Sequence, residues 1–266
     1  YLSKKKINLK INVLDEKKIN SYNLNNQNIN LINVNCLKTD KYIEECFNIA
    51  VKILKTGFSN KFINGPINKS KFLNKKFLGI TEYISQKFNV KKKAMLIYNE
   101  DLSVCPVTTH LPISLISKKI SKELIKEKAI LINNFFIKHI GYKPKIAVTG
   151  LNPHCESILK NNEDIKIVRP AVNALKEKGL KIYGPYPADT IFLKQNRKKY
   201  NVILGMYHDQ VLSPIKSLKE YDAINITLGL PFFRVSPDHG PNEKMINKDL
   251  SNPLSLTKAI KFLDRK

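Results

Sequence analysis

Short apolar runs alternate with longer amphipathic stretches along most of this chain. Runs such as 94–99 and 145–149 have the length and composition of buried β-strands. Between such runs, the segments 39–56, 117–140 and 164–178 carry apolar residues at helical spacing, and a glycine follows each of them. Alternation on this scale favours an α/β fold, in which a mostly parallel sheet has helices on both faces.

The same pattern predicts the remaining elements. Residues 94–99 and 102–107 are expected to form two strands joined by a tight hairpin. The other expected strands are 31–35, 62–64, 181–183, 202–206 and 223–228, and the other expected helices are 81–87 and 254–263.

The composition is that of a globular protein, with 42% hydrophobic and 26% charged residues. No apolar run reaches the roughly 18 residues that a membrane span needs, and the first residues lack the apolar core of a signal peptide. The four cysteines show no CxxC spacing, which favours free thiols in a reducing compartment. We therefore expect a cytoplasmic protein without membrane contact.

The net charge of +24 raises the question of nucleic-acid binding. The positive charge comes from 42 lysines and only four arginines, and it is spread along the whole chain. Nucleic-acid sites favour arginine because its guanidinium makes paired hydrogen bonds to phosphates and bases. The charge therefore favours an anionic small substrate over a specific nucleic-acid partner. A non-catalytic polyanion-binding protein is the lesser alternative.

Three of the five histidines, His110, His154 and His208, each stand shortly after the end of an expected strand. Open α/β sheets bind ligands beyond the carboxyl ends of their strands. Three imidazoles are a common ligand set for a catalytic divalent metal, so we predict a metal site here. Each histidine alone is more simply a loop or core residue. The neighbouring Cys155 is interpreted as a plain loop residue rather than a ligand or nucleophile.

Arginine is scarce, which draws attention to Arg234. It follows the expected strand 223–228 and a break at Gly229 and Pro231. An arginine at such a break is a candidate clamp for a phosphate or carboxylate. A surface salt bridge is an equally good interpretation of this residue alone.

Several ordered blocks resemble the 4-hydroxythreonine-4-phosphate dehydrogenase family, from about residue 60 to the end of the chain. The blocks are VTTHLP at 107–112, GLNPH at 150–154, GPYPADTIF at 184–192, MYHDQ at 206–210, INITLGLPFFR at 224–234 and DHG at 238–240. The resemblance implies two α/β/α domains with mostly parallel sheets and an interdomain cleft, as in isocitrate and isopropylmalate dehydrogenases. It places residues 1–85 with 217–266 in a nucleotide-side domain and residues 86–216 in a metal-binding and dimerisation domain.

The resemblance also implies a set of site residues. The divalent metal, which would be Zn, Co, Mg or Mn, would be held by His110, His154 and His208, in a site shared across a homodimer. The substrate contacts would be Thr81, Lys216, Asn225 and Arg234, and the residues near NAD or NADP would be His239, Gly240 and Asn252. Lys216 and Asp209 are the candidates for the catalytic base. Asp209 is equally well interpreted as a carboxylate that orients a ligand histidine.

The implied reaction is the NAD(P)-dependent and metal-dependent oxidation of 4-phosphooxy-L-threonine to 2-amino-3-oxo-4-phosphooxybutanoate. This product decarboxylates to 3-amino-2-oxopropyl phosphate on the route to pyridoxal 5'-phosphate. Two alternatives remain at this point. One is a sister dehydrogenase that acts on another phosphorylated hydroxy acid, such as 4-phosphoerythronate. The other is a metallohydrolase that has three histidine ligands and uses no nucleotide.

The chain departs from the family pattern at three places. Ile80 stands where the family has a histidine before the threonine of its GHTE block, which puts the substrate in doubt. The family's N-terminal strand and Gly-rich turn have no counterpart, so we expect that an N-terminal segment is missing. The loop after His154 reads CESIL and lacks the family's glycines.

Overall fold

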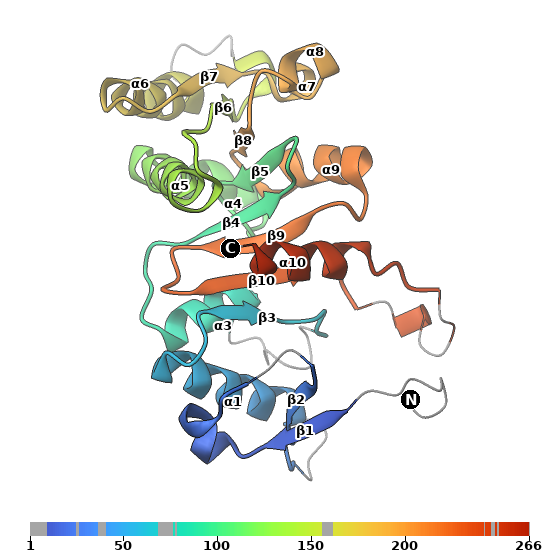
Figure 1. Ribbon diagram of the computed structural model, residues 1–266. Coiled ribbons are helices and arrows are strands. Elements are labelled where there is room, and N and C mark those ends of the chain that lie inside the picture. Colours follow the sequence, from blue (N-terminus) through green and yellow to red (C-terminus); the bar gives the residue numbers. More distant parts are fainter. Residues whose placement is uncertain are drawn as a thin grey trace.

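The computed structural model describes residues 10–24, 27–36, 41–68, 77, 79–155, 162–241, 243–245, 248 and 250–265. Its centre is an eight-stranded sheet with the strand order β3-β10-β9-β4-β5-β8-β6-β7 (Figure 1). The strands are β3 (Lys61–Ile63), β4 (Ala94–Tyr98), β5 (Ser103–Pro106), β6 (Ile146–Thr149), β7 (Ile182–Tyr186), β8 (Val202–Gly205), β9 (Ile224–Leu228) and β10 (Phe233–Pro237). A separate parallel pair joins β1 (Ile11–Leu14) and β2 (Ile29–Ile32).

Both strand directions occur in the large sheet. The pairs β3-β10, β5-β8, β8-β6 and β6-β7 are parallel. The pairs β10-β9, β9-β4 and β4-β5 are antiparallel. The predicted mostly parallel α/β sheet and the predicted hairpin are therefore confirmed. Because β5, β8, β6 and β7 run in one direction, their carboxyl ends lie at the same edge of the sheet.

Helices cover both faces of the sheet (Figure 1). Residues of α5 and α10 pack in one core cluster with the inward residues of the sheet, whereas residues of α9 pack in another. The α-helices are α1 (Tyr42–Thr56), α3 (Ile80–Lys87), α4 (Ile113–Lys119), α5 (Lys122–Phe135), α6 (Arg169–Glu177), α7 (Ala188–Ile191), α8 (Lys194–Arg197), α9 (His208–Lys219) and α10 (Leu254–Asp264). The π-helical turns are η2 (Phe136–Ile140) and η4 (Asp164–Val168), and the 3-10 turns are η1 (Glu16–Ser21), η3 (Pro153–Cys155) and η5 (Glu243–Met245).

Successive side chains of a strand point to opposite faces of the sheet. In β4, Leu96 and Tyr98 belong to the core cluster that contains α5 and α10, whereas Met95 and Ile97 belong to the cluster that contains α9. All five residues of β4 are buried, which explains why its sequence is apolar throughout and shows no alternation.

The single helix predicted for 117–140 is wrong, because two helices occupy this region. α4 ends before Ile120, and α5 begins after Ser121, whose hydroxyl accepts a hydrogen bond from the Leu124 amide. Ser121 has an extended backbone and caps α5. The buried Ile120 continues the apolar spacing across the break, so periodicity alone did not reveal it.

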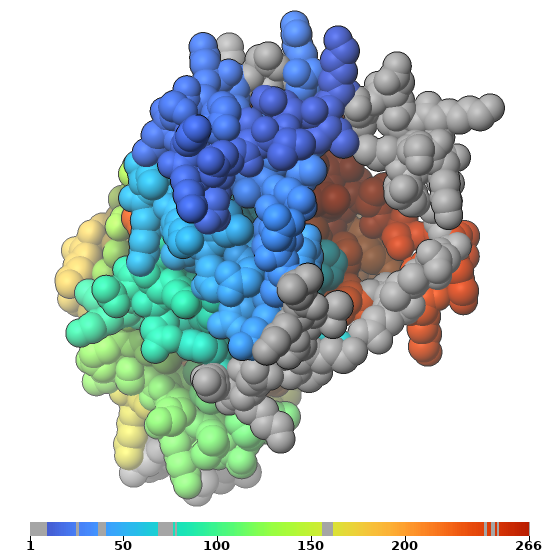
Figure 2. Space-filling model, turned by 90° about the horizontal axis from the view of Figure 1, so that it is seen from below, coloured from blue at the N-terminus to red at the C-terminus, as the bar shows by residue number. Residues whose placement is uncertain are grey.

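In the view from below, the blue N-terminal residues and some of the red C-terminal residues are both visible (Figure 2). The C-terminal helix α10 lies over β9 and β10 near the middle of the molecule, whereas β1 and β2 lie at one end (Figure 1). The predicted domain boundary falls between β9 and β4, which are neighbours in one sheet, and the division into two domains stays a prediction. Among the described residues, no helix has the length and apolarity to cross a membrane. Most of the changed loop after His154 falls on 156–161, outside the described residues.

Candidate active site

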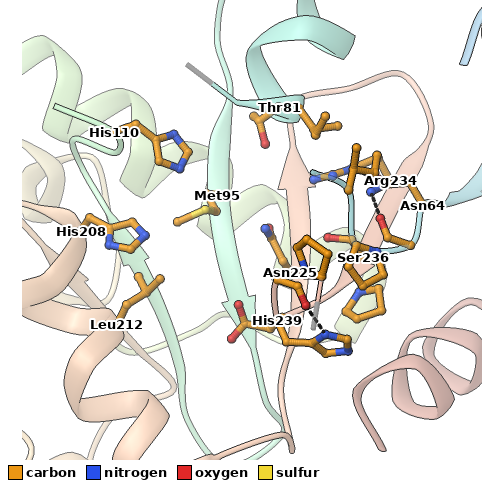
Figure 3. A pocket seen from close by; sticks show the side chains of 18 of the residues that line it. Asn64, Thr81, Met95, His110, His208, Leu212, Asn225, Arg234, Ser236 and His239 are labelled. Carbon is orange, nitrogen blue, oxygen red and sulfur yellow. Dashed lines mark hydrogen bonds between the residues drawn. The ribbon is translucent and has the colours of Figure 1, made fainter. Parts of the chain in front are cut away.

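A cavity of about 280 Å³ lies over one face of β4, β9 and β10 (Figure 3). It gathers residues from segments that are far apart in the sequence. Eight of the predicted site residues line it: Thr81, His110, His208, Lys216, Asn225, Arg234, His239 and Gly240. The structure therefore brings together most of the predicted substrate, cofactor and metal residues.

The floor of the cavity comes from strand pairing. Arg234 of β10 is opposite Thr227 of β9, and Ser236 is opposite Asn225. These residues alternate along their strands with residues of the apolar core, so they share the face that is turned away from α5. Met95 of β4, opposite Thr227, extends the same face.

One wall of the cavity is a face of α9. His208, Leu212 and Lys216 are four residues apart and all line the cavity. Residues at this spacing lie above one another on a helix, so the helix itself aligns the imidazole and the ammonium. Pro214 lies inside this helix, which explains why the sequence pattern did not predict it.

His110 and His208 lie side by side on one side of the cavity (Figure 3). Their ring centroids are 5.8 Å apart. Two imidazoles that share one ion at about 2.1 Å from each nitrogen would have ring centres roughly 5 Å apart, so the observed separation is close to that of a pair that holds a divalent metal. Asp209 Oδ1 is 2.6 Å from His208 Nδ1 and orients that ring, which leaves Nε2 for a ligand.

The third predicted ligand, His154, does not line this cavity. It lies in η3, beyond β6, where it is exposed and has a φ of 58°. Within the described part of one chain, no group of three His, Cys, Asp or Glu side chains could hold a metal ion. One chain therefore supplies two of the three predicted ligands. A site completed by a second subunit remains a prediction.

Two further predicted residues lie outside the cavity lining. Asp209 is 76% exposed and touches the site only through His208. Asn252 accepts a hydrogen bond from the Leu254 amide at the start of α10, which is the role of a helix cap. Cys155 is buried, and burial raises the pKa of its thiol. All four cysteines are free, as predicted.

Arg234 is 3% exposed, so the surface salt bridge considered from the sequence is excluded. Its Nε donates to Asn64 Oδ1 at 2.8 Å, and its Nη1 donates to Thr227 Oγ1 at 3.0 Å. Burial lowers its pKa to about 10, against the opposing effect of Glu82. Among the described residues, no carboxylate pairs with this guanidinium. A buried cation of this kind is suited to an anionic ligand.

Lys216 is paired with Asp238, a residue to which the sequence analysis assigned no role. Lys216 Nζ is 2.6 Å from Asp238 Oδ2 and also donates to the Asp238 backbone carbonyl. Burial raises the pKa of Asp238, and Lys216 opposes this effect. Asp238 begins the quoted DHG block, so a signal for it was present. No sequence signal pointed to Asn64 or Ser236, which reach the cavity through the pairing of β3, β10 and β9.

Ile80, which replaces the family histidine, lines the cavity and is 6% exposed. It packs with Phe47 and Tyr83 in an apolar cluster. Together with Met95 and Leu212 it makes part of the cavity lining apolar. These three side chains can contact a ligand only through van der Waals packing, and they cannot donate a hydrogen bond to it.

The fold is that of a class of α/β dehydrogenases. A solved 4-hydroxythreonine-4-phosphate dehydrogenase from Klebsiella pneumoniae matches with a TM-score of 0.78 and 28% identity, over 96% of this chain and 82% of that chain. Residues 2–263 match the family described as Pyridoxal phosphate biosynthetic protein PdxA. The chain belongs to this family, and the predicted resemblance is confirmed.

Curated relatives carry two different names. A 4-hydroxythreonine-4-phosphate dehydrogenase from Xanthobacter autotrophicus is 37% identical over 225 residues, which are 81% of this chain and 64% of the relative. A D-threonate 4-phosphate dehydrogenase from Pectobacterium atrosepticum is 38% identical over 199 residues, which are 73% of this chain and 61% of the relative. The matched part of the chain thus spans less than two thirds of these relatives.

Proposed function

We propose that the full protein is an NAD(P)-dependent and divalent-metal-dependent dehydrogenase. It oxidises 4-phosphooxy-L-threonine to 2-amino-3-oxo-4-phosphooxybutanoate, which decarboxylates to 3-amino-2-oxopropyl phosphate in pyridoxal 5'-phosphate biosynthesis. The observation that carries the proposal is one cavity in which a buried arginine, a lysine and a pair of neighbouring histidines meet. Family membership favours this reaction over a metallohydrolase.

The residues have separable tasks in this proposal. Arg234 binds an anionic group of the substrate, and Thr81 lies beside it through a 3.4 Å contact with Thr227. Asn225 supplies an amide at the centre of the floor. His239 and Gly240 form the rim on which we place the nicotinamide nucleotide. A divalent cation held by His110 and His208 would act as a Lewis acid on the substrate alcohol.

We further propose that the protein works as a cytoplasmic homodimer. His110 and His208 of one chain leave the metal site one histidine short of the predicted set. His154 is exposed and so is available to a second copy of the chain. Active sites that are completed across a twofold interface contain such exposed ligands in the isolated subunit.

The test is turnover by the full-length protein. Purified protein is freed of metal, supplied in turn with Zn²⁺, Co²⁺, Mg²⁺ or Mn²⁺, and mixed with NAD or NADP and 4-phosphooxy-L-threonine. We expect a metal-dependent rise in absorbance from the reduced nicotinamide and formation of carbon dioxide. Absence of both products with every metal and both nucleotides would refute the proposal.

A second candidate substrate is D-threonate 4-phosphate, or another phosphorylated hydroxy acid such as 4-phosphoerythronate. The apolar Ile80 in the cavity lining supports this second candidate substrate, because the family histidine is absent at that position. Relatives named for D-threonate 4-phosphate are as similar as those named for the amino substrate. Comparison of kcat/KM for the three compounds under identical conditions decides among them.

A further inference from the structure

A partly buried ion pair between Lys216 and Asp238 lies in the lining of the cavity, and its carboxylate has no assigned task. Building on the proposed function, we propose that Asp238 is the general base that accepts the proton of the substrate alcohol. Lys216 holds this carboxylate in place. The proposal replaces both base candidates from the sequence, Lys216 itself and Asp209.

The pairing argues against Lys216 as the base. Its Nζ is 2.6 Å from Asp238 Oδ2 and also donates to the Asp238 carbonyl. An ammonium held in this way has three donors and no lone pair, so it cannot accept a proton. The carboxylate beside it has lone pairs that the single ion pair does not use up.

Exposure argues against Asp209. The Asp209 side chain is 76% exposed and does not line the cavity, whereas the Asp238 side chain is 11% exposed and does. A base has to reach the proton that it abstracts within hydrogen-bond distance or through one water. Of the two carboxylates, Asp238 alone is placed inside the cavity.

Asp238 is also rigidly anchored. Its amide donates to Ser255 Oγ at 2.9 Å, and Ser255 Oγ donates to the Ala223 carbonyl at 2.5 Å. Ser255 is fully buried in α10, and Ala223 immediately precedes β9. Two elements of the fold therefore fix the backbone that carries the carboxylate, which is what a catalytic group needs.

Basic side chains surround the Asp238 carboxylate. Lys216 and His208 face it from α9, and His239 neighbours it in its own loop. Burial is the largest influence and raises the pKa of Asp238 above its usual range, while these three groups oppose it. A carboxylate with a raised pKa is a stronger proton acceptor than one with an ordinary pKa.

The step balances with the nucleotide as the oxidant. The alcohol O–H bond breaks, and its proton goes to the Asp238 carboxylate. The electron pair of the neighbouring C–H bond leaves as hydride to the oxidised nicotinamide, and the C=O double bond forms. After product release, Asp238 gives its proton to solvent.

The test compares two matched aspartate variants of the full-length protein. Asp238→Asn removes the proposed base. Asp101→Asn removes the 2.5 Å ion pair to Lys219, the last lysine of the same helix, at an 81% exposed side chain outside the cavity. We expect kcat of Asp238→Asn to fall by about 10²–10⁴-fold, with KM and metal affinity changed only slightly. Asp101→Asn keeps the kcat of the wild type, and Asp238→Glu recovers part of it.

A second readout does not depend on turnover. Brief acetylation of lysines, followed by mass spectrometry, reports how accessible each amine is. Asp238→Asn should raise the labelling of Lys216 and leave Lys219 unchanged, whereas Asp101→Asn should do the reverse. No increase at Lys216 in Asp238→Asn would contradict the holding role.

The pH profile of the wild type covers the case in which Asp238→Asn does not fold. A carboxylate base predicts that kcat reaches its plateau by about neutral pH and does not rise further in the alkaline range. A continued rise, or a folded Asp238→Asn within about threefold of wild-type kcat, would overturn the inference. If wild-type protein turns over none of the substrates, the proposed function itself fails instead.

Discussion

Arg234 shows at the residue scale how burial turns an ordinary side chain into a binding group. Its hydrogen bonds to Asn64 and Thr227 go to neutral oxygens, so they fix the guanidinium without neutralising it. A charge that is removed from water and has no directly paired carboxylate is costly in free energy. An anionic substrate group would remove that cost on binding. The free-energy cost of burying this guanidinium would therefore contribute to substrate affinity.

Replacement of Arg234 should therefore weaken substrate binding strongly. For Arg234→Met we expect a loss of about 2–5 kcal/mol in the free energy of binding, which is roughly 30-fold or more in kcat/KM. Arg265→Met is the control, because Arg265 is 49% exposed and pairs with Glu100 away from the cavity. Steady-state kinetics with the phosphorylated substrate measure both. Equal kinetics for the two variants would show that Arg234 has only a structural role.

Gly79 leaves the space in which Glu82 and His110 approach each other. A Cβ at this position would be 2.8 Å from Glu82 Oε2, 3.0 Å from His110 Cε1 and 3.3 Å from His110 Nδ1. Glu82 Oε2 is buried and has no hydrogen-bond partner among the residues that the structure describes. The backbone of residue 79 is extended, so the constraint on glycine is space and not conformation.

Gly79→Ala should thus displace the imidazole of His110 and weaken metal binding. We expect the dissociation constant for Co²⁺, measured by titration calorimetry, to rise by about tenfold or more. Gly65→Ala serves as the control, since a Cβ there would meet nothing within 4 Å. Unchanged affinity in Gly79→Ala would mean that His110 does not hold the metal, or that the Glu82 side chain moves aside at no cost in free energy.

At the element scale, the loops that follow the strands position the candidate metal ligands. β5 and β8 are parallel neighbours, so the loops after them bring His110 and His208 together. β6 is the next strand, yet His154 beyond it does not line the cavity of its own chain. The strand-end rule thus predicted which histidines lie at this edge, but it could not predict the direction of each side chain.

The break between α4 and α5 can be tested by its cap. Ser121→Ala removes the hydroxyl that accepts from the Leu124 amide, and we expect the free energy of unfolding to fall by about 1 kcal/mol. Ser117→Ala is the control, because Ser117 is exposed within α4. Urea unfolding followed by circular dichroism gives both values. A single continuous helix would show the same stability for both variants.

At the scale of the whole molecule, motifs were more informative than periodicity. The family resemblance predicted eight lining residues of the cavity, six of them within the quoted blocks. Asn64 and Ser236 escaped prediction because they reach the site through the pairing of β3, β10 and β9, which are distant in sequence. Of the pair β1-β2, only a strand in the region of β2 was predicted, because β1 is short and mostly exposed.

At this scale, mixed dimers test whether two subunits share each metal site. If the ligands of each site come from two chains, a dimer of one His110→Ala subunit and one His154→Ala subunit has two different sites. One site carries both changes, and the other site is intact. Random mixing of the two inactive variants should then restore about a quarter of the wild-type activity. A hybrid of His110→Ala with His208→Ala has no intact site, because both residues belong to the same cavity wall. Recovery in the first mixture but not in the second would establish the shared site, and no recovery in either would exclude it.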